Sequence, residues 1–403
     1  MARQHRSDYD PSAPAAPGLS TPMRSTLNIL ALVAAVCTVP SACAVNPVPT
    51  PATETKLATD RSTGGAKAQD AAASSDATTR SPDTEAANPN AAWDGAGADT
   101  GTVDAAVDAA PADTAAPADS GNGDASTADC AVPTTAGHHE PSCAGIVYDL
   151  HVPATCTANP CGLVVDVHGL TMSGEMQDNN TGMRKLGEKH GYVVLQPNAN
   201  PAPPGASWTP NEDDQKILDY LQAVIGKLSV DKKRIHFTGF SQGGWMSWRM
   251  LCKQPQLFAS IAPGAGCSFL GTEGCTFDGK QLPAVELPVL YMHGTKDVLQ
   301  GFDCAKKQLE AVTKAWGLQL TKTVSQDDKH IWQRYASAKG TVFEFIQHDY
   351  AASSFLLQGH CYPGSDDQSP KEPGQIAGFG CKGSNAFHWG EAAIAFFIAH
   401  PKP

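Results

Sequence analysis

The stretch Gly239-Phe240-Ser241-Gln242-Gly243 has the pattern Gly-x-Ser-x-Gly, and it decides how the rest of the chain is interpreted. A strand-like apolar run, 234–238, precedes it, and a helical pattern, 243–254, follows it. A serine on a tight turn between a strand and a helix projects its hydroxyl above the sheet, at the positive end of the helix. Glycines flank such a turn because strand and helix leave no space for Cβ atoms. The pattern therefore predicts that Ser241 is a nucleophile.

Apolar residues are unevenly distributed along the 403 residues of the chain. Residues 44–129 consist mainly of Ala, Asp, Thr, Pro, Ser and Gly, with few large apolar side chains apart from Leu57 and Trp93. A segment of this composition cannot bury enough apolar surface to offset the entropy of ordering. We expect residues 44–129 to form a disordered linker and residues 130–403 to form one folded domain.

The linker also carries most of the charge. It holds 14 acidic and 4 basic residues, which accounts for −10 of the formal net charge of −12. The acidity therefore indicates a solvated spacer and says little about the substrate of the folded domain. It argues against nucleic acid as a partner.

The N-terminal segment, residues 1–43, has the features of an export signal. Its apolar run, Leu27–Val39, is too short to span a bilayer, follows Arg24 and ends just before Pro40-Ser41-Ala42-Cys43. Small residues before a cysteine predict a bacterial lipoprotein signal, in which a lipidated Cys43 tethers the protein to a membrane. A plain secretory signal is the alternative. A translation start at Met23 would give this signal a short N-terminal region. Both signals predict an extracytoplasmic protein.

Ten cysteines remain after Cys37 and Cys43. An even, high number after an export signal predicts a disulfide-bonded domain. The spacing permits local bridges between Cys156 and Cys161, between Cys267 and Cys275, and between Cys361 and Cys381. Because no Cys-x-x-Cys pair occurs, we expect no zinc site.

Strand-like and helical segments alternate after residue 130. Several of the strand-like runs are continuously apolar, which is typical of strands buried on both faces of a parallel sheet. The alternation predicts a doubly wound, mostly parallel sheet with its functional site at the carboxyl ends of the strands. The expected strands are 145–152, 163–167, 192–195, 234–238, 258–262, 289–292 and 341–348, and the expected helices are 213–228, 243–254, 302–316 and 390–399.

A serine nucleophile needs a base, and the base needs an acid to orient it. Asp297 follows the apolar run that ends in His293-Gly294, so we expect it at the rim of the sheet, with Asp303 as its nearest competitor. His360 lies in a loop rich in glycine and proline, whereas its rival, His388, stands just before the last helix. A loop suits a general base better, so the sequence favours His360.

Three further residues are candidates for supporting roles. The turn after His168-Gly169 can present the backbone N–H of Leu170 (or Thr171) beside that of Gln242, which would form an oxyanion hole. We interpret His168 as a support for this turn. Trp208 is a candidate substrate platform, although core packing is the commoner role of such aromatics. The pair His138-His139 beside Glu140 is interpreted as a solvated surface run.

The segment from about 144 to 401 resembles the secreted polyhydroxybutyrate depolymerases and feruloyl esterases of carbohydrate esterase family 1, which are α/β-hydrolases. In that group the serine, the aspartate after His-Gly and the histidine of a Gly-His-x-x-Pro-Gly loop form the triad, and these roles fall on Ser241, Asp297 and His360. The chain departs from the group in having Tyr362 where Trp is frequent, and Gln242 where Ala is frequent. The resemblance rests on the stretches 164–169, 231–244, 293–297, 359–364 and 395–401.

This resemblance and the motifs together predict a secreted or surface-tethered serine esterase that requires no metal or organic cofactor. The expected substrate is an ester: a polyester oligomer, a feruloylated or acetylated polysaccharide, or a small ester. A peptidase or an acyltransferase on the same fold is an alternative, and a non-catalytic lipoprotein that binds glycans is another.

Overall fold

The computed structural model describes residues 130–267, 285–326 and 328–403. The expected signal, the linker, Cys43 and Cys275 lie outside the described residues. The described strands are β1 Gly137–His139, β2 Ser142–Cys143, β3 Ile146–Val152, β4 Cys161–Val167, β5 Tyr192–Asn198, β6 Val230–Phe240, β7 Ser260–Gly264, β8 Val289–Gly294, β9 Gln319–Gln326, β10 His330–Ala336 and β11 Val342–His348. The helices are the 3₁₀ turn η1 Ala154–Thr157, α2 Gly174–Thr181, α3 Met183–His190, α4 Glu212–Lys227, α5 Gln242–Lys253, α6 Phe302–Trp316 and α7 Trp389–Ala399.

The described strands form one sheet, with the order β1-β3-β5-β4-β6-β7-β8-β11-β10-β9 and β2 beside β3. The strands from β5 to β11 in this order pair in parallel, and antiparallel strands extend both edges. The prediction of a mostly parallel, doubly wound sheet is confirmed. All seven expected strands and all four expected helices are present, with ends shifted by a few residues.

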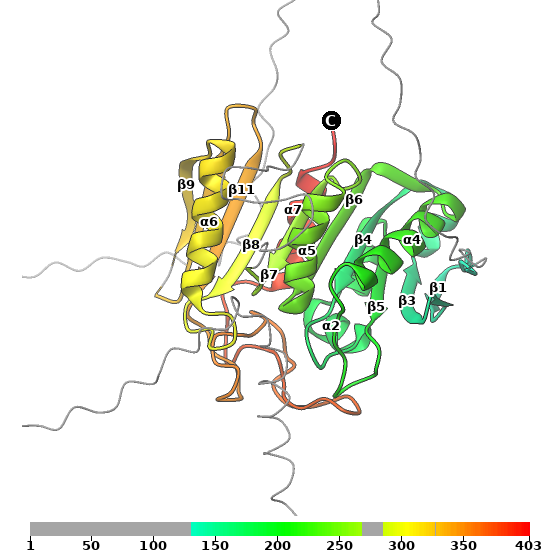
Figure 1. The fold of residues 1–403 in the computed structure, drawn as a ribbon, viewed down its shortest axis with the longest axis horizontal. Coiled ribbons are helices and arrows are strands. Elements are labelled where there is room, and N and C mark those ends of the chain that lie inside the picture. The colour runs from blue at the N-terminus through cyan, green and yellow to red at the C-terminus, as the bar shows by residue number, and fades with distance from the viewer. Residues whose placement is uncertain (1–129, 268–284, 327) are drawn as a thin grey trace, which may run out of the picture. The chain divides into compact units, whose positions relative to one another are not determined.

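Helices cover both faces of the sheet because successive residues of the central strands point to opposite sides. In β4, Leu163 and Val165 belong to one core cluster with residues of α4, α5 and α6. Val164 belongs to the other cluster, together with residues of α2, α3 and α7. Figure 1 shows α5 and α6 in front of the sheet and α7 behind it. The loops that follow the parallel strands gather at the lower edge in that view.

Disulfides close several of the connections. Bonds between Cys156 and Cys161 and between Cys361 and Cys381 confirm two of the expected pairings, and a third joins Cys130 to Cys143. The suggested pairing of Cys267 with Cys275 is wrong, because Cys267 is bonded to Cys304 in the first turn of α6. Cys267 follows β7 and α6 follows β8, the neighbour of β7, so the sheet brings the two cysteines together across 37 residues.

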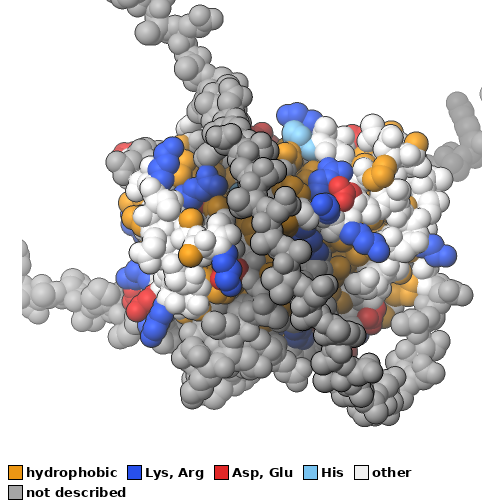
Figure 2. Space-filling model, turned by 90° about the horizontal axis from the view of Figure 1, so that it is seen from above, with side chains coloured by type: hydrophobic (Ala, Val, Ile, Leu, Met, Phe, Trp, Pro, Cys, Tyr) orange, Lys and Arg blue, Asp and Glu red, His pale blue; other side chains and the backbone are white. Residues whose placement is uncertain are grey.

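One face of the described domain carries several basic side chains. Figure 2, which views the molecule from above Figure 1, shows lysine and arginine side chains scattered among uncharged and apolar ones. Within the described ranges, no helix has both the length and the apolar character that crossing a bilayer requires.

Candidate active site

Ser241 occupies the turn between β6 and α5 that the sequence predicts. Its backbone has φ +56° and ψ −114°, a strained conformation for a residue with a side chain. The turn is tight against β4: a Cβ added at Gly243 would lie 2.0 Å from the carbonyl oxygen of Val167. Ser241 is half-buried at the start of α5, at the carboxyl edge of the parallel strands.

Asp297 and His360 meet although 63 residues separate them in the chain. The distance between His360 Nδ1 and Asp297 Oδ2 is 2.6 Å, and both residues are buried. An antiparallel bridge between Asp297 and Gln358 brings the two loops together. The disulfide of Cys361 then fixes the chain immediately after the histidine. The loop that follows β8 therefore holds an acid against an imidazole, as the sequence predicts.

Asp297 is held in its ionised form. Its other carboxylate oxygen, Oδ1, accepts hydrogen bonds from the backbone N–H groups of Leu299 and Gln300 at 2.9 and 2.8 Å. Burial alone would raise the pKa of Asp297, but the interactions with His360 and the N–H donors outweigh burial and lower it. An ionised Asp297 accepts from Nδ1–H of His360, which leaves Nε2 of the ring as the proton acceptor.

The serine turn and the histidine loop share a neighbour. The ring of Phe240, the residue before Ser241, lies 4.7 Å from the ring of His360, measured between centroids. It also stacks on the ring of Tyr362 at 3.9 Å. Phe240 is fully buried, so the packing around it joins the two loops.

The two rival residues occupy other positions. His388 caps the N-terminus of α7, where its Nδ1 accepts from the backbone N–H of Glu391 at 3.4 Å. Asp303 lies on the surface in the first turn of α6, and its carboxylate pairs with Lys306 at 2.6 Å. Neither of these side chains contacts the Asp297–His360 pair in any described interaction.

The turn after β4 approaches Ser241, as expected for an oxyanion hole. A Cβ added at Gly169 would lie 3.1 Å from Cβ of Ser241. The N–H of Thr171 donates to the carbonyl of Ala206 at 2.8 Å, so Thr171 is not an available donor. The N–H groups of Leu170 and Gln242 have no acceptor among the described residues.

His168 supports this turn. Its Nε2 accepts from the N–H of Ala199 at 3.0 Å, and its Nδ1 is 2.7 Å from the carbonyl oxygen of Gly169. Burial lowers the pKa of His168 to about 4, so the ring is neutral. The interpretation of His168 as a structural residue agrees with these contacts.

The candidate role of Trp208 as a substrate platform is wrong. Only 4% of the residue is exposed, and its ring packs 4.7 Å from that of His168. Its indole N–H donates to the carbonyl of His168 at 2.9 Å, and its backbone N–H donates to Oε1 of Gln242. Trp208 therefore connects the turn after β4, the proposed oxyanion turn, to the serine turn. Almost none of its ring surface is left for a ligand.

Exposed apolar side chains lie beside Asp297 and His360 in the chain, a feature that the motifs did not reveal. Val298 and Leu299, directly after Asp297, are 52% and 38% exposed. Phe355 and Leu356, shortly before His360, are 79% and 41% exposed. Their apolar character beside both motifs is the signal that sequence inspection could have used. We call these four residues the apolar rim.

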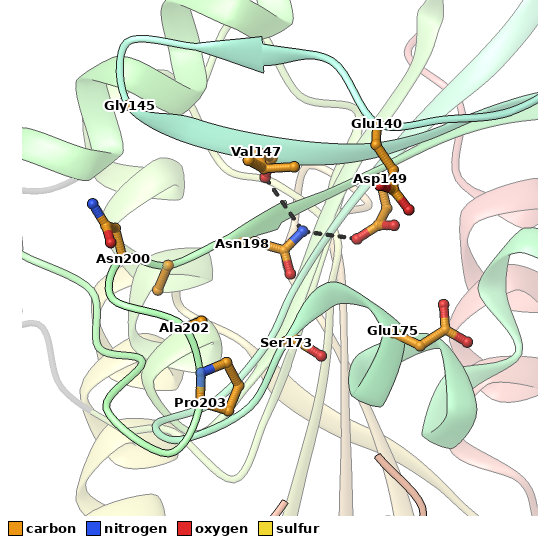
Figure 3. A pocket seen from close by; sticks show the side chains of 11 residues that line it. Glu140, Gly145, Val147, Asp149, Ser173, Glu175, Asn198, Asn200, Ala202 and Pro203 are labelled. Atoms are coloured by element: carbon orange, nitrogen blue, oxygen red, sulfur yellow. Dashed lines mark hydrogen bonds between the residues drawn. The ribbon is translucent and has the colours of Figure 1, made fainter. Parts of the chain in front are cut away.

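A separate hollow of about 510 Å³ lies between the start of β3, the end of β5 and the N-terminus of α2 (Figure 3). Polar residues line much of it, among them Glu140, Asp149, Ser173, Glu175 and Asn198. The Asn198 side chain donates to Asp149 Oδ2 at 2.8 Å, and its oxygen accepts from the N–H of Gly174. Ser241, Asp297 and His360 do not line this hollow.

Beside the hollow, His138, Glu140 and Asp149 bring possible metal-ligand atoms within 4.8 Å of one another. His138 Nε2 is 2.8 Å from Asp149 Oδ1, so His138 is more than a solvated surface residue. The guanidinium of Arg184 comes within 3.5 Å of the same His138 nitrogen. Protein groups thus partner this cluster, and the positive charge of Arg184 would oppose a cation there.

Comparison with known proteins assigns the fold. Residues 209–347, which include the serine turn and the Asp297 loop, match the model of the phospholipase/carboxylesterase family. The described domain has the α/β-hydrolase fold.

Several curated relatives of this chain are named as esterases or depolymerases, the same groups that the motifs resemble. A bifunctional acetylxylan esterase/xylanase of Neocallimastix patriciarum is 23% identical over 48% of this chain and 27% of its own length. A feruloyl esterase B of Piromyces equi is 28% identical over 34% of this chain and 26% of its own. A poly(3-hydroxyalkanoate) depolymerase C of Paucimonas lemoignei is 30% identical over 29% of this chain and 30% of its own. The chain spans between a quarter and a third of the length of each of these three relatives.

Proposed function

We propose that this α/β hydrolase is an extracytoplasmic serine esterase that hydrolyses carboxylic esters through Ser241, His360 and Asp297. The observation that carries the proposal is the buried 2.6 Å contact between His360 and Asp297, in a histidine loop that packs against the residue before Ser241. The relatives with esterase names support the same reaction class.

In the proposed reaction, Nε2 of His360 removes the proton of Ser241 while the serine oxygen attacks the ester carbonyl. The ionised Asp297 keeps the proton on Nδ1 of His360 and stabilises the imidazolium that forms. The N–H groups of Leu170 and Gln242 stabilise the oxyanion of the tetrahedral intermediate. His360 then protonates the leaving alcohol, and the acyl group remains on Ser241.

In the second half of the reaction, His360 activates a water molecule, which attacks the acyl-enzyme and releases the acid. Every proton transfer in this scheme uses residues of the described domain.

The apolar rim supports an ester with an apolar acyl or aromatic part, because it offers apolar surface next to the acid and the base. The disulfides support a protein that works in an oxidising compartment. A lipid on Cys43 would tether it there, and mass analysis of the native N-terminus tests this.

Labelling with a fluorophosphonate tests the proposal. The wild-type protein should react with one equivalent of the reagent, and Ser241→Ala should not react. Ser229→Ala, a change at an exposed serine before β6, is the matched control and should label like the wild type. An unlabelled wild type, or equal labelling of Ser241→Ala, would exclude the proposed nucleophile.

A substrate panel separates the reaction classes. It should contain p-nitrophenyl esters, methyl ferulate, hydroxybutyrate oligomers and peptide amides. The esterase proposal expects hydrolysis of at least one ester class and no cleavage of the amides. Cleavage of amides in preference to esters would favour a peptidase, and transfer of the acyl group to an added alcohol in preference to water would favour an acyltransferase.

A further inference from the structure

Helix α2 buries polar side chains in the middle of the domain. Gln177, Asn180 and Thr181 are all fully buried, although a surface helix normally turns apolar residues inward. The helix begins shortly after the oxyanion turn and lies at the same edge of the sheet as the loops of the active site (Figure 1). Buried amides and hydroxyls need partners, so their hydrogen bonds show what the helix holds in place.

One set of these bonds ends on Asp166, in the strand that leads into the oxyanion turn. Asp166 is fully buried and accepts from Gln177 Nε2 at 2.6 Å, from Thr181 Oγ1 at 2.9 Å and from Gln196 Nε2 at 2.9 Å. These donors are neutral amides and a hydroxyl. An ionised carboxylate can only accept hydrogen bonds, so it fixes the amide of Gln177 with its NH₂ group toward Asp166.

The orientation of Gln177 then selects its second partner. With the NH₂ group directed at Asp166, the carbonyl oxygen Oε1 of Gln177 accepts from the hydroxyl of Tyr362 at 2.5 Å. Tyr362 is two residues after His360, is fully buried and stacks on Phe240 at 3.9 Å with 23° between the ring planes. A chain of two directional hydrogen bonds thus connects β4 to the loop that carries His360.

We propose that the Tyr362 hydroxyl is a positioning group that fixes His360 relative to Ser241 through Gln177 and Asp166. This inference rests on the proposed function. Stacked rings can slide over each other at little cost, so the contact of Tyr362 with Phe240 does not by itself fix the loop. The disulfide of Cys361 and the backbone hydrogen bonds of Tyr362 with Phe379 and Cys381 hold the main chain of this loop. The hydrogen bond to Gln177 adds the side-chain contact that sets the position of the Tyr362 ring along Phe240, and so refines the position of His360 relative to Ser241.

Tyr362→Phe tests the proposal because it removes only the hydroxyl and keeps the ring. We expect kcat to fall on the order of tenfold with KM unchanged, since a small misplacement of a catalytic group lowers the rate without weakening substrate binding. The matched control is Tyr148→Phe. Tyr148 is also fully buried, stacks on Tyr220 at 4.1 Å and donates to the carbonyl of Lys216 at 3.2 Å. It should lose comparable stability and keep kcat within about twofold.

Gln177→Met is the second variant and should lower kcat as much as Tyr362→Phe does. The double variant should lower kcat no further, because both changes break the same connection. Equal kcat in Tyr362→Phe and the wild type, or equal losses in Tyr362→Phe and Tyr148→Phe, would overturn the inference. A wild type that neither labels nor hydrolyses esters would instead defeat the proposed function, so the two failures are distinguishable.

Discussion

The backbone of Gly359 lies against the backbone of Gly294, with no space for a side chain on either residue. A Cβ added at Gly294 would lie 2.1 Å from the carbonyl oxygen of Gly359, and one added at Gly359 would lie 2.6 Å from the backbone nitrogen of Asp297. The end of β8 at His293-Gly294 therefore packs directly against the loop at Gly359-His360. This contact brings Asp297 close to His360.

Gly359→Ala should separate the two loops. Because the new Cβ would meet backbone atoms, the loop of His360 has to move, and we expect kcat/KM for an ester to fall on the order of a hundredfold. Gly301→Ala is the control, since a Cβ at Gly301 would meet nothing within 4 Å. Steady-state kinetics of both variants checks this. An active Gly359→Ala would mean that the contact does not position the acid and the base.

Asp297→Asn should preserve the shape of the site and remove its charge. The amide cannot hold His360 in the tautomer that needs Nδ1–H, so kcat should fall about 10⁴-fold. Asp303→Asn, at the competing position on the surface of α6, should stay within about twofold of the wild type. A large loss in Asp303→Asn with a small one in Asp297→Asn would reverse the assignment of the acid.

Removing the Cys361–Cys381 disulfide by a double change to serine should lower both stability and activity. The chain-entropy relation gives a loss of ~3 kcal/mol for a bond that spans 20 residues. Activity should fall as well because Cys361 adjoins His360. The Cys156–Cys161 double variant is the control, since this bond lies at the opposite end of β4 from the oxyanion turn. It should lose stability with kcat unchanged. If both double variants lowered kcat equally, the Cys361–Cys381 disulfide would have no particular role at the site.

The positions of Ser241, Asp297 and His360 were predictable from the sequence because each lies in a local pattern with a geometric cause. The strained turn at Ser241 requires its glycines. His360 directly follows Gly359, Asp297 lies three residues after Gly294, and the backbones of these two glycines make the contact described above. The continuous apolar runs likewise predicted the central parallel strands. For these features, the local sequence pattern alone predicts the conformation that the folded domain adopts.

The features that escaped prediction have weak local signals. Helix α2 was missed because it buries amides and a hydroxyl in place of apolar residues, and only the partners in β4, β5 and the Tyr362 loop explain that burial. The strands β9 and β10 were missed because they form a polar edge of the sheet. Trp208 was misjudged since composition does not show which way an indole faces. The partner of Cys267 depends on strand order, which local spacing does not contain.

Asp166 should make the stability of the domain depend on pH in a direction opposite to that of a salt-bridged carboxylate. Burial raises the pKa of Asp166 to about 6, above its ordinary value of 3.8. At pH values between 3.8 and about 6, the folded state keeps the proton of the Asp166 carboxyl, whereas the unfolded state releases it. The stabilisation is therefore complete below pH 3.8 and is lost as the pH rises through about 6, by ~3 kcal/mol in all.

Asp166→Asn removes this titration. The asparagine oxygen can still accept from Gln177. The asparagine NH₂ group can donate to Oε1 of Gln196 if the Gln196 amide turns by 180°. Oε1 of Gln196 is free to accept because it is buried without a hydrogen-bond partner among the described residues. The free energy of unfolding of both proteins, measured by urea denaturation from pH 4 to pH 7, checks the prediction. Asp297, whose pKa is lowered, changes the unfolding free energy with pH in the opposite direction. Because it does so equally in both proteins, its contribution cancels when one curve of unfolding free energy against pH is subtracted from the other. Between pH 4 and pH 7 the difference should move by ~2 kcal/mol in favour of the variant, and a constant difference would mean that Asp166 titrates at its ordinary value.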